Sequence, residues 1–116
     1  DVVVPDGLRR IDDEHQSYSR SNGSWRRGHF VYRGNTSVAE AAAYVLQRMP
    51  QHDWREQANE SSEPNRRRLE FVRGIYRTEY QLVREYGRTE MIVDYITTLA
   101  EDAVEGDETK MEGAKD

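Results

Sequence analysis

The sequence predicts an α+β domain: a curved antiparallel sheet of about five strands with one helix packed on one face, in the order β-β-α-β-β-β. One segment, residues 37–49, has apolar residues at helical spacing, whereas the segments on either side alternate apolar and polar residues as strands do. Charged residues make up 34% of the chain and hydrophobic residues 35%. Most strands therefore have only one apolar face, which is typical of an antiparallel sheet half covered by a helix.

Two strands are expected before the helix, on either side of a turn. Asn22-Gly23 supplies residues that tolerate positive φ, the commonest sequence signal for a tight hairpin. Because side chains alternate along a strand, Phe30 and Tyr32 fall on one face and Val31 falls on the other. We expect Phe30 and Tyr32 to face the helix.

The helix is predicted from its two ends and from its apolar face. Ser37 can cap the first turn, and Glu40 stands three residues later to complete a capping box. Pro50 ends the helix, because its ring clashes with the preceding turn. The residues that repeat at helical spacing between these ends are Val38, Ala41, Ala42, Val45, Leu46 and Met49.

After the helix the alternation of strands returns, in segments 54–61, 66–74, 78–86 and 89–99, within which we expect three strands. Residues 61–65 form a polar loop. In the segment that begins at Thr89, Ile92 and Ile96 share the face that points away from the helix. Two isoleucines on that face indicate a second layer or a partner.

The chain divides into an extended lead (1–13), a single α+β domain (14–100) and an acidic tail (101–116). Residues 101–116 hold seven acidic and two basic side chains, which account for the whole net charge of −5. So charged a segment is expected to be disordered. The first residue is Asp1 rather than Met, so we expect a processed or trimmed chain, which permits a cleaved or lipid-bearing terminus.

A set of packing residues resembles a loose group of small bacterial secreted proteins and lipoproteins of unknown function. In that group a Y-x-G … M-x-x-x-G-W pattern frames the helix, and Asp53 stands here where those sequences often carry glycine. The resemblance covers roughly residues 15–96 and implies an envelope setting, with no known catalytic residue and no cofactor. The matching positions are Tyr32-x-Gly34, Ser37-Val38, Tyr44-Val45, Met49, Asp53-Trp54, Leu69 and Phe71.

His52-Asp53 is the arrangement closest to a catalytic motif. A histidine oriented by a carboxylate needs a nucleophile within reach. The chain has no cysteine, and none of its serines stands in a Gly-x-Ser-x-Gly elbow. Trp54 follows directly, so we interpret His52-Asp53 as a polar turn above an aromatic plug, and the protein as a non-enzyme.

Cofactors, metals and membrane spans are not predicted. The three histidines, His15, His29 and His52, lack the i, i+4 spacing of a zinc-binding helix and have no cysteine partners. No small-molecule substrate is evident. No run approaches the roughly 20 apolar residues that cross a bilayer.

An arginine-rich region leaves nucleic-acid binding as an alternative function. The region has aromatic residues between its basic ones, as nucleic-acid-binding sheets do. However, the order of residues in "RRRLEFVRG" differs from that of the RNP1 motif, and residues 1–100 carry no net charge. Glu70, Glu79 and Glu85 are placed for cross-strand ion pairs. The basic residues are Arg66, Arg67, Arg68, Arg73 and Arg77.

The face of the sheet that points away from the helix is the candidate interface. Apolar residues among arginines and carboxylates resemble a non-obligate protein interface; the alternative is a scatter of single exposed apolar residues. We expect a non-enzymatic domain of a bacterial envelope or secreted protein, with a cytoplasmic location as the alternative. We expect this domain to bind a protein partner or to form a homodimer. The candidate interface residues are Val31, Arg66, Arg68, Val83, Ile92 and Ile96.

Overall fold

The computed structural model describes residues 3–11, 18–22, 25–63 and 65–97. In these residues, three strands precede a single α-helix and four follow it, with a turn of 3-10 helix directly after the α-helix. The elements are β1 (Leu8–Arg10), β2 (Tyr18–Asn22), β3 (Trp25–Gly34), α1 (Val38–Arg48), η1 (Met49–His52), β4 (Arg55–Glu63), β5 (Arg66–Arg73), β6 (Tyr76–Glu85) and β7 (Arg88–Thr97).

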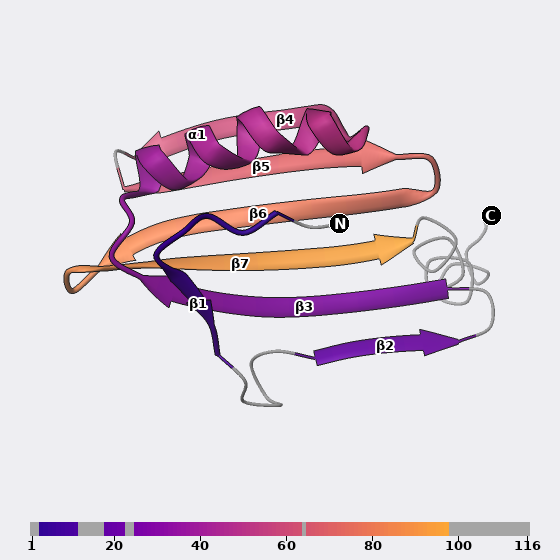
Figure 1. Cartoon of the computed structure of the whole chain (residues 1–116), viewed down its shortest axis with the longest axis horizontal. Coiled ribbons are helices and arrows are strands. Elements are labelled where there is room, and N and C mark those ends of the chain that lie inside the picture. Colours follow the sequence, from indigo (N-terminus) through magenta and orange to yellow (C-terminus); the bar gives the residue numbers. More distant parts are fainter. Residues whose placement is uncertain (1–2, 12–17, 23–24, 64, 98–116) are drawn as a thin grey trace, which may run out of the picture.

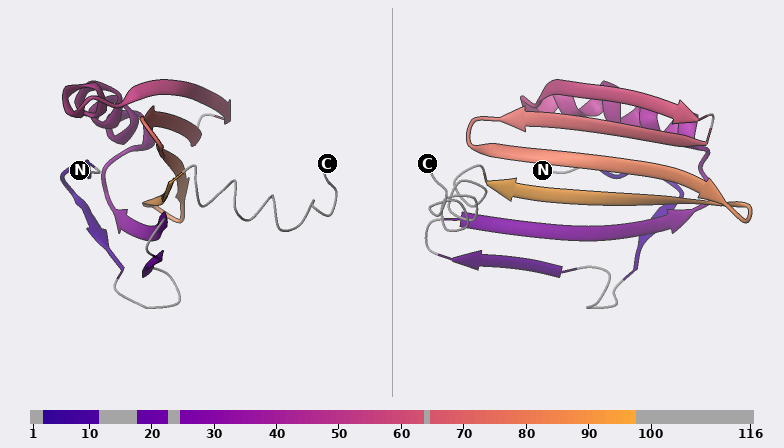
Figure 2. Two further views of the ribbon diagram at one scale, coloured as in Figure 1. Left: turned by 90° about the vertical axis from the view of Figure 1, so that its right-hand side faces the viewer. Right: turned by 180° about the vertical axis from the view of Figure 1, so that it is seen from behind.

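The strands form one antiparallel sheet in the order β1-β3-β7-β6-β5-β4, and β2 also pairs with β3. Since the other edge of β3 is taken by β7, strands β1 and β2 share the remaining edge. Strands β4 to β7 are successive hairpins, and β7 closes the arrangement by returning to β3 (Figure 1). The sheet is curved, with α1 on its concave side (Figure 2). The predicted α+β class is confirmed, with seven strands in place of about five.

One additional strand comes from a segment whose alternation the sequence shows, and the other comes from the expected lead. All four alternating segments after the helix are strands. The fourth, β7, lies between β6 and β3 and so holds the two parts of the sheet together. The other addition is β1, in the residues expected to be an extended lead. The acidic tail lies outside the described residues.

The helix begins and ends as its sequence predicts. Ser37 Oγ accepts a hydrogen bond from the backbone N–H of Glu40 at 3.1 Å, which satisfies one of the free donors of the first turn. Pro50 lies at the start of η1, where its missing N–H costs no helical hydrogen bond. The predicted apolar face is buried against the sheet, with Leu46 partly buried.

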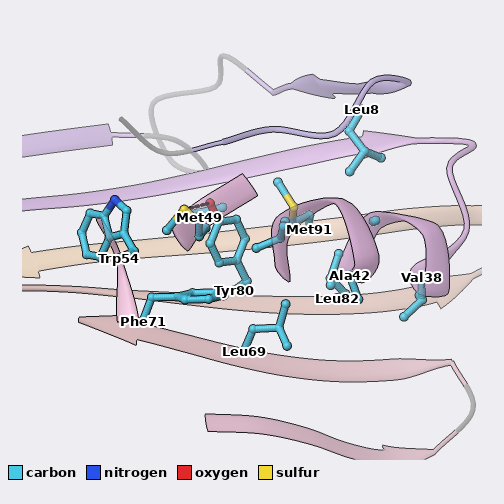
Figure 3. Packing of buried hydrophobic residues seen from close by; sticks show 13 residues of the cluster. Leu8, Val38, Ala42, Met49, Trp54, Leu69, Phe71, Tyr80, Leu82 and Met91 are labelled. Carbon is cyan, nitrogen blue, oxygen red and sulfur yellow. Dashed lines mark hydrogen bonds between the residues drawn. The ribbon is translucent and has the colours of Figure 1, made fainter. Parts of the chain in front are cut away.

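The core lies between α1 and the concave face of the sheet (Figure 3). Tyr80 stands near its centre: its ring meets Phe71 edge-on at 6.0 Å, and its hydroxyl lies 3.5 Å from Met49 Sδ. Burial raises the pKa of the Tyr80 hydroxyl far above its usual range. The other core residues are Leu8, Val38, Ala41, Ala42, Val45, Trp54, Leu69, Leu82, Met91 and Val93.

The N-terminal segment completes this core. Leu8 is buried, and the Tyr80 hydroxyl donates a hydrogen bond to the backbone oxygen of Val3 at 2.9 Å. The segment comes close to β3 because Gly34 has no side chain: a Cβ there would lie 1.7 Å from the carbonyl oxygen of Gly7. Thr36 Oγ1 then donates to the backbone oxygen of Asp6 at 2.6 Å. Residues that the sequence analysis placed outside the domain are therefore packed into it.

Candidate interface on the outer face of the sheet

The outer face is the face of the sheet opposite α1. The strand register alternates core and outer residues as predicted: Tyr32 lies opposite Met91 on the core side, and Val31 lies opposite Ile92 on the outer side. The same alternation puts Arg66 opposite Val83 on the outer face. All six candidate interface residues are on this face, which four strands, β5, β6, β7 and β3, supply.

The six residues do not form one continuous patch. Four of them line a hollow of about 450 Å³, which we call the large hollow: Arg66, Arg68, Val83 and Ile92. Ile96 lies instead in a separate hollow of about 250 Å³, surrounded by charged side chains. Val31 and Ile96 are only 5% and 7% exposed, so neither offers the apolar surface that was expected of it. The remaining residues of the large hollow are Glu60, Arg67, Gln81, Leu82, Glu85 and Glu90.

Arg68 is the electrostatic centre of the outer face. Its Nη2 donates to Glu70 Oε1 at 2.8 Å, and its Nε donates to Glu79 Oε2. Its Nη1 lies 3.5 Å from Glu60 Oε1. The hydrogen bond to Glu79 raises the pKa of the Arg68 guanidinium, so this group stays charged. Arg77 Nε lies 3.6 Å from Glu70 Oε2, so Arg77 extends the network of ion pairs along β6.

Further polar contacts run across neighbouring strands. Arg33 Nε donates to Glu90 Oε2 at 2.9 Å. His29 Nδ1 and Asp94 Oδ1 lie 2.6 Å apart, and Arg66 lies 4.0 Å from Glu85. The predicted cross-strand pairs of Glu70, Glu79 and Glu85 are therefore present, with Arg77, Arg68 and Arg66 as the respective partners.

These pairs bear on the nucleic-acid alternative. Arg66, Arg68 and Arg77 each face a carboxylate, so their charge is already balanced within the sheet. Alternation along β5 also sends Arg67 toward the helix side, where its Nε donates to Asn59 Oδ1 at 2.8 Å. The arginine-rich strand is thus divided between two faces and does not present one basic surface.

His52-Asp53-Trp54 has the packing role that the sequence analysis gave it. Trp54 is 2% exposed and meets Tyr95 edge-on at 6.5 Å, while the Arg73 guanidinium lies 4.5 Å above its indole ring. Arg73 also donates to the backbone oxygen of His52 at 2.9 Å. Asp53 has φ 69°, a left-handed conformation that glycine adopts more readily. The side chains of His52 and Asp53 are exposed.

The two histidines in the described part of the chain, His29 and His52, lie on different elements. His29 contacts Asp94 on β7, His52 is the last residue of η1, and His15 lies outside the described residues. Within residues 3–11, 18–22, 25–63 and 65–97, no three acidic or histidine side chains are grouped so as to hold a metal ion.

Tyr86 is a feature of the outer face that the sequence analysis missed. It occupies the two-residue turn between β6 and β7 with φ 54°, and its side chain is fully exposed. It borders a hollow of about 300 Å³, the small hollow, with Arg33 and Arg88. The small and large hollows share Val83, Glu85 and Glu90, so they adjoin. The signal was available: in Tyr86-Gly87 an aromatic residue stands where such turns usually carry Asn or Asp.

Comparison with known proteins finds no counterpart: no model of a protein family, no curated protein and no solved structure matches this chain. In the part of the chain that the structure describes, no helix has the length and apolar character needed to cross a membrane.

Proposed function

We propose that this chain is a non-enzymatic association module of a bacterial envelope or secreted protein, and that its outer face binds a second copy of the chain. The observation that carries the proposal is the large hollow. It combines half-buried apolar residues, Val83 and Ile92, with a rim of arginine and glutamate side chains. Apolar centres with charged rims and an enrichment in arginine are typical of protein interfaces.

The charges of the large hollow favour self-association. The side chains on its outer side carry both signs: Arg66 and Arg68 are basic, whereas Glu60, Glu85 and Glu90 are acidic. In a two-fold symmetric contact the same surface serves both copies. A surface that carries both signs can therefore pair its arginines with the glutamates of a rotated copy, whereas a surface of one sign would repel itself.

The free edge at β4 favours a contact through the face over a contact through the edge. The pairing of β4 with β5 shifts register twice, between Glu56 and Ala58 and between Glu60 and Glu63. Bulges and charged side chains on an edge strand prevent another strand from pairing with it. This edge is thus protected, while the outer face offers a shaped surface.

The envelope setting rests on the resemblance to secreted proteins and lipoproteins. Its glycine position corresponds to Asp53, whose φ of 69° is a conformation that suits glycine. The local backbone therefore agrees with that pattern even though the residue differs.

The deciding experiment measures the oligomeric state by sedimentation equilibrium. Ile92→Glu is expected to weaken dimerisation by about 10- to 100-fold, because a carboxylate buried in the contact loses its hydration. Ile75→Glu is the matched control, since Ile75 is an exposed apolar residue in the turn between β5 and β6, outside the outer-face hollows. Ile96 is unsuitable for this test because it is buried. A wild-type protein that stays monomeric at every soluble concentration would refute the proposal.

A further inference from the structure

The backbone conformation of the turn at Tyr86-Gly87 is unfavourable for a tyrosine. Tyr86 and Gly87 have φ values of 54° and 75°, and two successive positive φ values define a type I′ hairpin turn. Glycine adopts such φ values without strain, and asparagine and aspartate tolerate them, but a bulky side chain does so only at an energetic cost. The Tyr86 side chain is fully exposed and buries no apolar surface in return. A bulky residue at positive φ that makes no stabilising contacts within the fold indicates a function in binding rather than in folding.

Arg84 holds this turn in place. Its Nη2 donates to the backbone oxygen of Gly87 at 3.1 Å, and its Nη1 donates to Thr89 Oγ1 at 2.8 Å. Nη1 also reaches the backbone oxygen of Asn35 at 3.4 Å, which ties the hairpin to the segment between β3 and α1. Tyr86 is therefore presented on a fixed support. A rigid tyrosine that loses little entropy on contact is a common anchor in protein interfaces.

The anchor and a place to receive it lie on the same surface. Tyr86 borders the small hollow, which adjoins the large hollow through Val83, Glu85 and Glu90. The large hollow offers Val83 and Ile92 to a ring, and its arginine and glutamate side chains can bond a phenolic hydroxyl. In a two-fold contact, each copy inserts its own projecting side chain into the partner and accepts the partner's side chain in its own hollow. A projecting side chain next to a hollow of suitable chemistry fits this arrangement.

We propose that Tyr86 of one copy inserts into the large hollow of a second copy, and that the reciprocal insertion completes a symmetric dimer. This inference rests on the proposed function and names its anchor. The second copy is favoured over an unrelated partner because the projection and the hollow occur together on one surface that carries charges of both signs.

The test uses a substitution that separates folding from association. Tyr86→Asn restores the Asn-Gly pair that this turn prefers, so its melting temperature is expected to rise. Sedimentation equilibrium should show dimerisation weakened at least about tenfold, as for loss of an interface anchor. Ile75→Asn, at the turn between β5 and β6, is the control and should dimerise as wild type does. A Tyr86→Asn protein that dimerises with wild-type affinity would overturn the inference.

Two further variants test the reciprocal geometry. Tyr86→Phe keeps the ring and should dimerise within a few-fold of wild type; a loss as large as that of Tyr86→Asn would contradict insertion of the ring. Val83→Glu blocks the hollow and leaves the projection. Mixed with Tyr86→Asn, it should form heterodimers through the one remaining insertion, and these should be tighter than the homodimers of either variant. Failure of the mixture to form heterodimers would contradict the insertion.

The results also separate this inference from the proposed function. If Ile92→Glu abolishes dimers while Tyr86→Asn leaves them intact, the outer face is the interface but Tyr86 is not its anchor. If the wild-type protein is monomeric, both proposals are refuted together.

Discussion

Gly34 is the residue on which the packing of the N-terminal segment depends. The backbone of residues 6–8 approaches so closely that a methyl group at Gly34 would overlap the carbonyl oxygen of Gly7. A backbone atom cannot move aside as a flexible side chain can. The glycine of the Tyr32-x-Gly34 pattern thus has a structural role: its lack of a side chain allows β1 to pair with β3 at the edge of the sheet.

Gly34→Ala is therefore expected to destabilise the fold by about 1–3 kcal/mol, the usual cost of forcing extra volume into a packed site. Urea denaturation monitored by tryptophan fluorescence would measure the loss. Gly28→Ala is the comparison, because the nearest atoms to a Cβ there belong to the Phe30 ring. That ring can rotate, so a smaller loss is expected. Equal stability of Gly34→Ala and wild type would show that the N-terminal segment does not pack as described.

At the level of single elements, α1 is the part that the sequence predicted best. Its cap, its buried stripe and its end at Pro50 all follow from local rules that need no knowledge of the rest of the chain. We expect Met49→Ala to lower the free energy of unfolding by about 2–5 kcal/mol and Ser37→Ala by about 1 kcal/mol. Wild-type stability of both variants in chemical denaturation would contradict the capped helix on the concave face.

There are physical reasons why the sequence analysis did not predict some features of the structure. Strand β1 has three residues and one buried side chain, Leu8, which is too short for alternation to be seen. The faces of the long strands follow from a period of two, so the six candidate residues were placed on the correct face. How deeply each residue is buried depends on its cross-strand neighbours, so the burial of Val31 and Ile96 could not be read from the pattern. Asp53 and Tyr86 adopt left-handed conformations although neither residue is glycine.

The whole molecule combines a buried tyrosine core with a charge-paired exterior, and this combination governs its response to alkali. Burial raises the pKa values of Tyr80, Tyr32 and Tyr95 in the folded state, whereas unfolded tyrosines titrate near about 10. Below that pH both states keep these protons, so the tyrosines add no pH dependence. Above it the unfolded chain loses protons that the folded chain retains, so the free energy of unfolding falls as pH rises.

Thermal melts between about pH 8 and pH 11 would measure this effect, with a plateau at the lower end and a decline above about 10. Tyr80→Phe is expected to be less stable at neutral pH, because it loses the hydrogen bond to Val3. It should, however, lose less further stability on going to alkaline pH. An equally steep decline in both proteins would place the titrating group elsewhere.

The place of β7 between β6 and β3 has a consequence for the order in which the chain folds. Strands β4 to β7 can form as neighbouring hairpins, but β3 meets its central partner only across a long separation: His29 and Asp94 are 65 positions apart. Pairings between distant segments close large loops and slow the folding transition. During synthesis, β3 and α1 leave the ribosome well before β7 exists. Until then β3 can pair only with β1 and β2. Its other edge has no partner, and we expect this segment to be the one that a chaperone covers until β7 emerges.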